Sequence, residues 1–154
     1  ASDMKLARDV PGHGWKAATI DAARLRALLW APLAPLLVPL MNLRPLYRRI
    51  WPPVQRSLRI CEAALPVDMP SWHTYVLEWR ADSVHFGVDG ASVLDCDRAP
   101  AGPLGFVMWV DNQYMVVKPW GRLGFGYLET PGRQWMEVDQ LSLVPLDRDQ
   151  GAMP

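Results

Sequence analysis

The sequence predicts a mainly β protein, an antiparallel β-sandwich with a helical insertion rich in leucine and proline near its N-terminus. In residues 70–146, apolar and polar side chains alternate in short runs that prolines and glycines separate. Residues 22–65 instead combine good helix formers with prolines. We therefore expect residues 1–154 to form a single, incomplete sandwich domain, in which residues 22–65 are a helical insertion or lid.

Composition excludes some classes of partner. The chain has 154 residues, half of them apolar, which is enough for one domain with a core. Sixteen basic residues balance sixteen acidic ones, so no net field attracts nucleic acid, and we expect no nucleic-acid partner. Cys61 and Cys96 lie in different segments without metal-ligand spacing. The sequence favours two buried thiols over a disulfide framework or a zinc site.

The first elements are a strand and a helix. Residues 14–20 follow a turn signal and are β-branched and aromatic enough to predict a strand. Asp21 can cap a helix that begins near Ala22 and continues to Trp30. A second helix is expected over residues 54–65, because their apolar side chains recur at helical spacing.

Residues 27–43 contain no charged side chain and approach the shortest length that spans a bilayer. Three prolines, Pro32, Pro35 and Pro39, oppose a spanning helix, so we expect no transmembrane segment. Arginines flank the run on both sides, as they do in a segment that contacts a membrane surface or in a lid over an apolar ligand. Packing of these leucines on the sandwich is the alternative.

The remaining residues predict strands. Residues 72–79 and 83–88 alternate, the Asp89-Gly90 pair predicts a hairpin turn, and residues 91–94 form the return strand. Later strands are expected over residues 105–110, 114–117, 124–128 and 134–144.

Residues 72–90 also contain a specific sequence motif, namely Trp-His-x-Tyr, then Glu-Trp, then Phe-x-Val-Asp-Gly. This motif resembles a strand pair of the family-16 glycoside hydrolases, in the concanavalin A-like lectin and glucanase superfamily. Residues 103–110 and 135–143 are similar to that family's next core strand and closing strand. The resemblance covers about half of the chain, the C-terminal half of such enzymes. It implies a jelly-roll sandwich and either a glycoside hydrolase or a degenerate carbohydrate-binding relative.

The same resemblance implies a catalytic strand written Glu-x-Asp-x-(x)-Glu, because a retaining mechanism needs two carboxyl groups about 5 Å apart. No such triplet precedes Trp72, and Glu137-Val138-Asp139 falls in the expected closing strand. The catalytic residues therefore stay unassigned, and retaining hydrolysis depends on strands outside this chain. No cofactor is expected except a structural calcium ion, because Asp139 matches a position at which many relatives bind one.

A sugar site combines aromatic faces with planar polar groups. The sequence offers one such ligand-binding constellation, made of Trp109, Asp111, Asn112, Gln113, Tyr114 and Trp120. The alternative is a core tryptophan followed by a polar turn. His85 joins the candidates, because it alternates with Gly87 and can face a cleft; the alternative is a core histidine. Glu78 and Glu129 are either cleft carboxylates or structural residues.

Two other functions stay open. The chain is an enzyme or binding protein for an apolar small molecule if residues 27–43 lid a cavity. It is an interaction module if a second chain, or a second copy in a homo-oligomer, completes the sandwich and covers its edges. Residues 1–5 lack the apolar run of a secretory signal, which favours the cytoplasm, although this start looks truncated.

Overall fold

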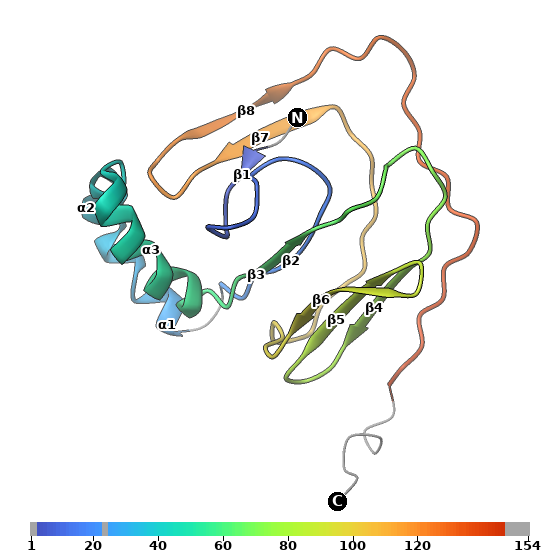
Figure 1. Ribbon diagram of the computed structural model, residues 1–154, viewed down its shortest axis with the longest axis horizontal. Coiled ribbons are helices and arrows are strands. Elements are labelled where there is room, and N and C mark those ends of the chain that lie inside the picture. Colours follow the sequence, from blue (N-terminus) through green and yellow to red (C-terminus); the bar gives the residue numbers. More distant parts are fainter. Residues whose placement is uncertain (1–2, 23–24, 147–154) are drawn as a thin grey trace, which may run out of the picture.

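The computed structural model describes residues 3–22 and 25–146, and within them the chain forms three small sheets and a group of short helices (Figure 1). The strands are β1 (Asp3–Met4), β2 (Lys16–Thr19), β3 (Cys61–Ala64), β4 (Tyr75–Trp79), β5 (Val84–Val88), β6 (Ala91–Cys96), β7 (Gln113–Val117) and β8 (Leu123–Tyr127). The helices are α1 (Leu25–Leu28), the 3-10 helix η1 (Ala31–Leu33), α2 (Ala34–Leu40) and α3 (Arg44–Ser57). The prediction of a mainly β protein is confirmed.

The sheet β4-β5-β6 is antiparallel throughout, as the alternating pattern predicts. The turn between β5 and β6 has Asp89 at φ 51° and Gly90 at φ 80°. Two consecutive positive φ angles are typical of the two-residue hairpin turn that Asp-Gly favours. The predicted hairpin is therefore confirmed, with an irregularity in the β5–β6 register between Phe86 and Gly87.

The other sheets have the orders β1-β7-β8 and β2-β3. The expected strands over 14–20, 114–117 and 124–128 are confirmed to within two residues at each end. All the helices lie between β2 and β3, which pair with each other from Thr19 opposite Cys61 to Lys16 opposite Ala64. The helices are thus an insertion between two paired strands. Among the described residues, none of the helices has the length and apolar character needed to cross a membrane.

The second helix predicted over residues 54–65 is wrong in its bounds. The helix α3 ends at Ser57, Arg59 takes a positive φ of 50°, and Cys61–Ala64 is a strand. Helical spacing of apolar residues alone could not reveal this, because the pairing of β3 with β2 is a contact across some 45 residues of chain. Long-range pairing overrides local helix preference here.

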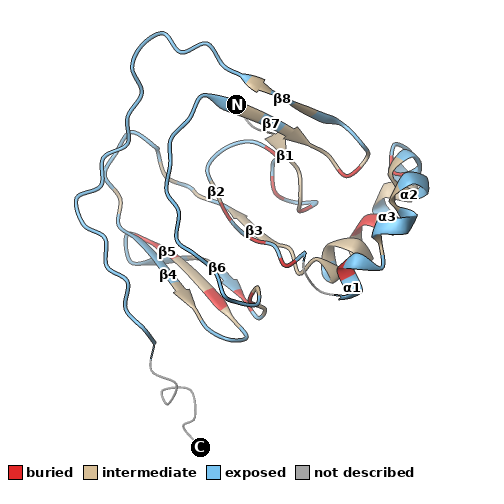
Figure 2. Cartoon of the chain, turned by 180° about the vertical axis from the view of Figure 1, so that it is seen from behind, coloured by how far each residue is buried: buried red, intermediate tan, exposed pale blue. Residues whose placement is uncertain are grey.

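The strands predicted over residues 105–110 and 134–144 are also wrong. Both segments lack regular secondary structure and are exposed along their whole length, as the pale blue connections in Figure 2 show. Alternation of side chains indicates which face an extended chain would bury, but a strand also needs a hydrogen-bonded neighbour. In the described part of the chain, neither segment has one.

The main core lies between the β2-β3 ribbon and the apolar face of the sheet β4-β5-β6. Its buried members are Val84, Cys96 and Ala99, and Trp79 and Phe86 pack against them. Cys61 of β3 and Cys96 of β6 form a disulfide bond in this core, with Cα atoms 6.3 Å apart. The expectation of two thiols is therefore wrong, because folding brings together two strands whose separation in sequence carries no pairing signal.

Candidate functional site

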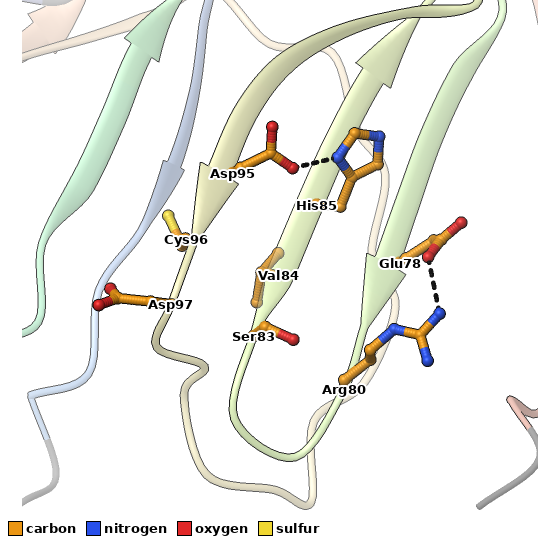
Figure 3. Close-up of a pocket in the computed structure, with 8 residues that line it drawn as sticks. All are labelled: Glu78, Arg80, Ser83, Val84, His85, Asp95, Cys96 and Asp97. Atoms are coloured by element: carbon orange, nitrogen blue, oxygen red, sulfur yellow. Dashed lines mark hydrogen bonds and ion pairs between the residues drawn. The ribbon is translucent and has the colours of Figure 1, made fainter. Parts of the chain in front are cut away.

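One face of the sheet β4-β5-β6 carries polar side chains from all three strands. Glu78 of β4 lies opposite His85 of β5, and His85 lies opposite Asp95 of β6. Side chains directly opposite each other share a face of the sheet, so the three form one lateral row across it (Figure 3). We call Glu78, His85 and Asp95 the polar row.

The imidazole of His85 is held by a carboxylate. Its Nδ1 hydrogen-bonds to Oδ1 of Asp95 at 2.5 Å, and the hydroxyl of Ser92 donates to the other Asp95 oxygen at 2.6 Å. The Ser92 hydroxyl, and secondly His85, keep the pKa of Asp95 below its usual range. Asp95 is therefore a carboxylate at neutral pH, and it leaves Nε2 of His85 free of this bond.

Glu78 occupies the other end of the polar row and pairs with an arginine. Arg80 donates from Nη2 to Oε2 of Glu78 at 3.1 Å, and each of the two side chains is less than half exposed. The pair is near solvent, so it contributes little stability. Its consequence is positional, because it holds a planar guanidinium and a planar carboxylate beside the imidazole.

These groups line an open hollow of about 330 Å³ at one end of the sheet. Its lining residues are Glu78, Arg80, Ser83, Val84, His85, Asp95, Cys96 and Asp97. Beside the hollow, Gly87 lacks a side chain, and a Cβ there would lie 3.5 Å from Nε2 of His85. The glycine thus leaves the free nitrogen of His85 unobstructed. The volume of the hollow is at the lower end of the range for small-molecule sites.

The structure separates the predicted aromatic constellation into two places. Trp109, Asp111 and Asn112 lie in the exposed connection between β6 and β7, with Trp109 69% exposed. Asn112 donates from Nδ2 to the carbonyl of Leu128 at 3.2 Å, which closes that end of the β7-β8 hairpin.

The other members of the constellation lie along and beyond β7. Gln113 begins β7 and donates its backbone N–H to Asp111 Oδ1 at 3.2 Å, while the Tyr114 ring covers Gly126 of β8. Trp120 lies past the far end of the strand, edge-on to Tyr47 of α3 at 5.3 Å between ring centroids. His85 belongs to a different sheet, so the structure does not assemble these residues into one site.

Asp139, the candidate calcium ligand, lies in the exposed segment after β8. Within residues 3–22 and 25–146, no group of three or more histidine, cysteine or acidic side chains could hold a metal ion. The calcium assignment therefore stays a prediction from the resemblance.

Sequence reasoning named His85 and considered Glu78, but it missed Asp95, Ser92 and Arg80. The available signal was the hairpin itself. With the turn at Asp89-Gly90, counting back along both strands places His85 opposite Asp95 once the extra residue of the bulge is included. Without the bulge, the register assigns these residues to opposite faces.

A second histidine, His73, has a structural role. His73 hydrogen-bonds from Nδ1 to Asp89 Oδ2 at 2.7 Å and from Nε2 to the carbonyl of Asp68 at 2.9 Å. Asp89 also accepts the backbone N–H of Thr74 at 2.9 Å. These bonds join the β5–β6 turn to the loop before β4. The hydrogen bond to Asp89 is the main reason why the pKa of His73 is raised.

No protein-family model matches the chain, and comparisons with curated proteins and with solved structures also gave no match. The polar row and the sequence motif of residues 72–90 are therefore the observations that bear on function.

Proposed function

We propose that the chain binds carbohydrate on the polar face of β4-β5-β6, as a degenerate relative of family-16 glycoside hydrolases with a jelly-roll sandwich. The single observation that carries this proposal is the polar row, in which Glu78, His85 and Asp95 lie side by side on one face. The resemblance of residues 72–90 supports the same class of ligand.

The chemistry of the row suits sugar hydroxyls. Adjacent strands are about 4.8 Å apart, so a flat array of two carboxylates and an imidazole repeats at that spacing. Carboxylate oxygens accept hydrogen bonds from hydroxyls, while Arg80 and the free Nε2 of His85 supply complementary groups. The hollow is open to solvent, as a site for part of a longer chain has to be.

The spacing of the row favours binding over retaining hydrolysis. Glu78 and Asp95 are two strands apart, which separates their backbones by about 10 Å. A retaining glycosidase holds its two carboxyl groups about 5 Å apart. The imidazole of His85 also lies between them. We therefore assign the row to ligand binding and assign no residue to catalysis.

Calorimetric titration with laminarin-like oligosaccharides tests this proposal. We expect saturable binding that Glu78→Gln and His85→Ala each weaken about tenfold, a loss of about 1.4 kcal/mol. Glu129→Gln and His13→Ala are matched controls, because both residues are exposed and lie outside the hollow. Folded protein that gives no heat with any oligosaccharide, or equal affinity in all four variants, would disprove it.

A different observation favours a second function, self-assembly. Two exposed segments, residues 104–110 and 135–144, have no strand partner within the described residues. They carry large apolar side chains, including Val107 at 70% and Leu143 at 71% exposure. Unpaired extended chain of this kind adds strands to another sheet. We propose that a second copy of the chain pairs with these segments.

Light scattering tests the assembly. We expect twice the 17.4 kDa chain mass for the wild type, and the monomer mass after Val107→Asp combined with Leu143→Asp. Leu43→Asp is the control, since Leu43 is exposed but lies in the helical insertion. A wild type that stays monomeric at the highest soluble concentration excludes this second function.

A further inference from the structure

Charge is strongly segregated along a chain whose net charge is zero. Residues 22–60, which we call the helical block, contain seven arginines and no aspartate, glutamate or lysine. The block therefore has a formal charge of plus seven, and the rest of the chain has a formal charge of minus seven. Although the whole chain is neutral, the helical block produces a large local electrostatic field. This field attracts an anionic surface to the helices.

The arginines of the block face solvent. The exposed ones in the described structure are Arg26, Arg44, Arg48, Arg49 and Arg56. Within residues 3–22 and 25–146, no carboxylate forms an ion pair with any of these five. Their charge is therefore available to an external partner.

The helix α3 is amphipathic in a way that explains this exposure. At 100° per residue, Arg44, Arg48 and Arg56 lie within one third of the helix surface. On the opposite side, Leu46, Tyr47, Ile50 and Val54 are half-buried. Trp51, at the edge of the arginine side, is buried, and its indole N–H donates to the carbonyl of Leu6 at 2.8 Å. The half-buried apolar side faces the protein, so the arginines face solvent.

The neighbouring helices expose leucine instead of burying it. Leu25 of α1 is 74% exposed and Leu36 of α2 is 63% exposed. Further exposed leucines of the block are Leu28, Leu29, Leu33, Leu40 and Leu43. A set of exposed leucines this large, next to exposed arginines, has the composition of a segment that lies in a membrane interface.

We propose that the helical block binds the surface of an anionic lipid bilayer, with its leucines in the headgroup and acyl boundary and its arginines on the anionic headgroups. The helices are too short to span, so the contact is peripheral. The β2-β3 ribbon lies between the helices and the sheet β4-β5-β6 (Figure 1), so the polar row stays open when the block is on a membrane. The inference is independent of the carbohydrate proposal.

Sedimentation with lipid vesicles tests the proposal on the full chain. One set of vesicles is phosphatidylcholine alone, and the other is phosphatidylcholine mixed with phosphatidylserine. We expect binding to the mixed vesicles only, with a loss of at least about fivefold on raising ionic strength to about 1 M, where the Debye length falls to about 3 Å. Equal binding to both vesicles, or none to either, overturns the proposal.

Matched variants separate charge from apolar insertion. We expect Arg49→Glu to weaken binding to the mixed vesicles several-fold, and Arg133→Glu, the same change at an exposed arginine outside the block, to leave it unchanged. Leu36→Ser should also weaken binding, while Leu104→Ser should not, although both leucines are more than half exposed. Circular dichroism shows whether each variant keeps the wild-type secondary structure.

The competing hypothesis is that the acidic remainder of a second copy binds the helical block. This hypothesis predicts a salt-sensitive dimer in the absence of lipid, which Arg49→Glu dissociates. That result, together with no binding to mixed vesicles, overturns the membrane proposal. Equal loss of vesicle binding in Arg49→Glu and Arg133→Glu also overturns it, since net charge alone would then explain the attraction.

Discussion

Cys61 of β3 and Cys96 of β6 form a disulfide bond that links two sheets which share no hydrogen-bonded strand pair in the described structure. The bond lies in the core beside Val84 and Ala99. Disulfides persist mainly in oxidising compartments, so this bond favours such a compartment.

Removing this link should lower stability substantially. The bond closes a loop between residues 35 positions apart, and the chain-entropy model gives about 3.8 kcal/mol for a loop of that length. We expect Cys61→Ala combined with Cys96→Ala to lose roughly that free energy of unfolding, measured by urea denaturation. A double variant as stable as the oxidised wild type would show that the two sheets hold together without it.

The contacts of His73 should make stability depend on pH. The pKa of His73 is raised in the folded state, first by its hydrogen bond to Asp89. Its stabilisation is complete below the unfolded pKa of about 6.5 and is lost as the pH rises through the folded pKa. Asp89 contributes in the opposite direction, because its pKa is lowered, first by the Thr74 N–H, and its stabilisation is lost in acid.

We therefore expect the free energy of unfolding to fall as the pH rises from about 6 to about 8, and to fall again below about pH 4. His73→Asn should remove the first decrease and keep the acid decrease. Denaturation at a series of pH values measures both. A neutral-range slope that survives in His73→Asn would assign it to another group.

The Glu62 carboxylate is completely covered and should be sensitive to neutralisation. It pairs with Lys16 and accepts the backbone N–H of Ala7 at 2.8 Å. Glu62→Gln leaves the ammonium of Lys16, whose side chain is only 14% exposed, without its counter-charge. Loss of one partner of a buried pair costs about 3 kcal/mol or more. Urea denaturation should show that loss in Glu62→Gln and less than about 0.5 kcal/mol in exposed Glu129→Gln.

Any side chain at Gly90 should lower the stability of the protein, because of the backbone conformation there. Its φ of 80° is unfavourable for any residue with a Cβ, although open space surrounds the position. Gly90→Ala should lose about 1 kcal/mol or more of unfolding free energy. Gly105→Ala is the matched control, since that position is also open but has no positive φ. Equal stability of the two variants in thermal denaturation would contradict the assigned turn.

Local patterns sufficed for elements whose partners are close in sequence. The hairpin of β5 and β6 follows from alternation around Asp89-Gly90, and β7-β8 follows from alternation around a Pro-Trp-Gly turn. Neighbouring strands pair through short turns, so the same residues specify both the strand and its partner. Pairing with a distant segment leaves no such local signal. Local patterns alone therefore led to the expectation that residues 105–110 and 134–144 are strands.

By itself the sequence determined the β character of the C-terminal half, the hairpin turn, the uncharged leucine-rich run and the arginines around it. Only the tertiary structure decided that β3 pairs with β2, that Cys61 reaches Cys96, and that Glu78, His85 and Asp95 share one face. The physical reason is that side-chain periodicity reports which face a residue lies on. Which strands become neighbours, and in what register, depends on packing and hydrogen bonding between segments far apart in the chain.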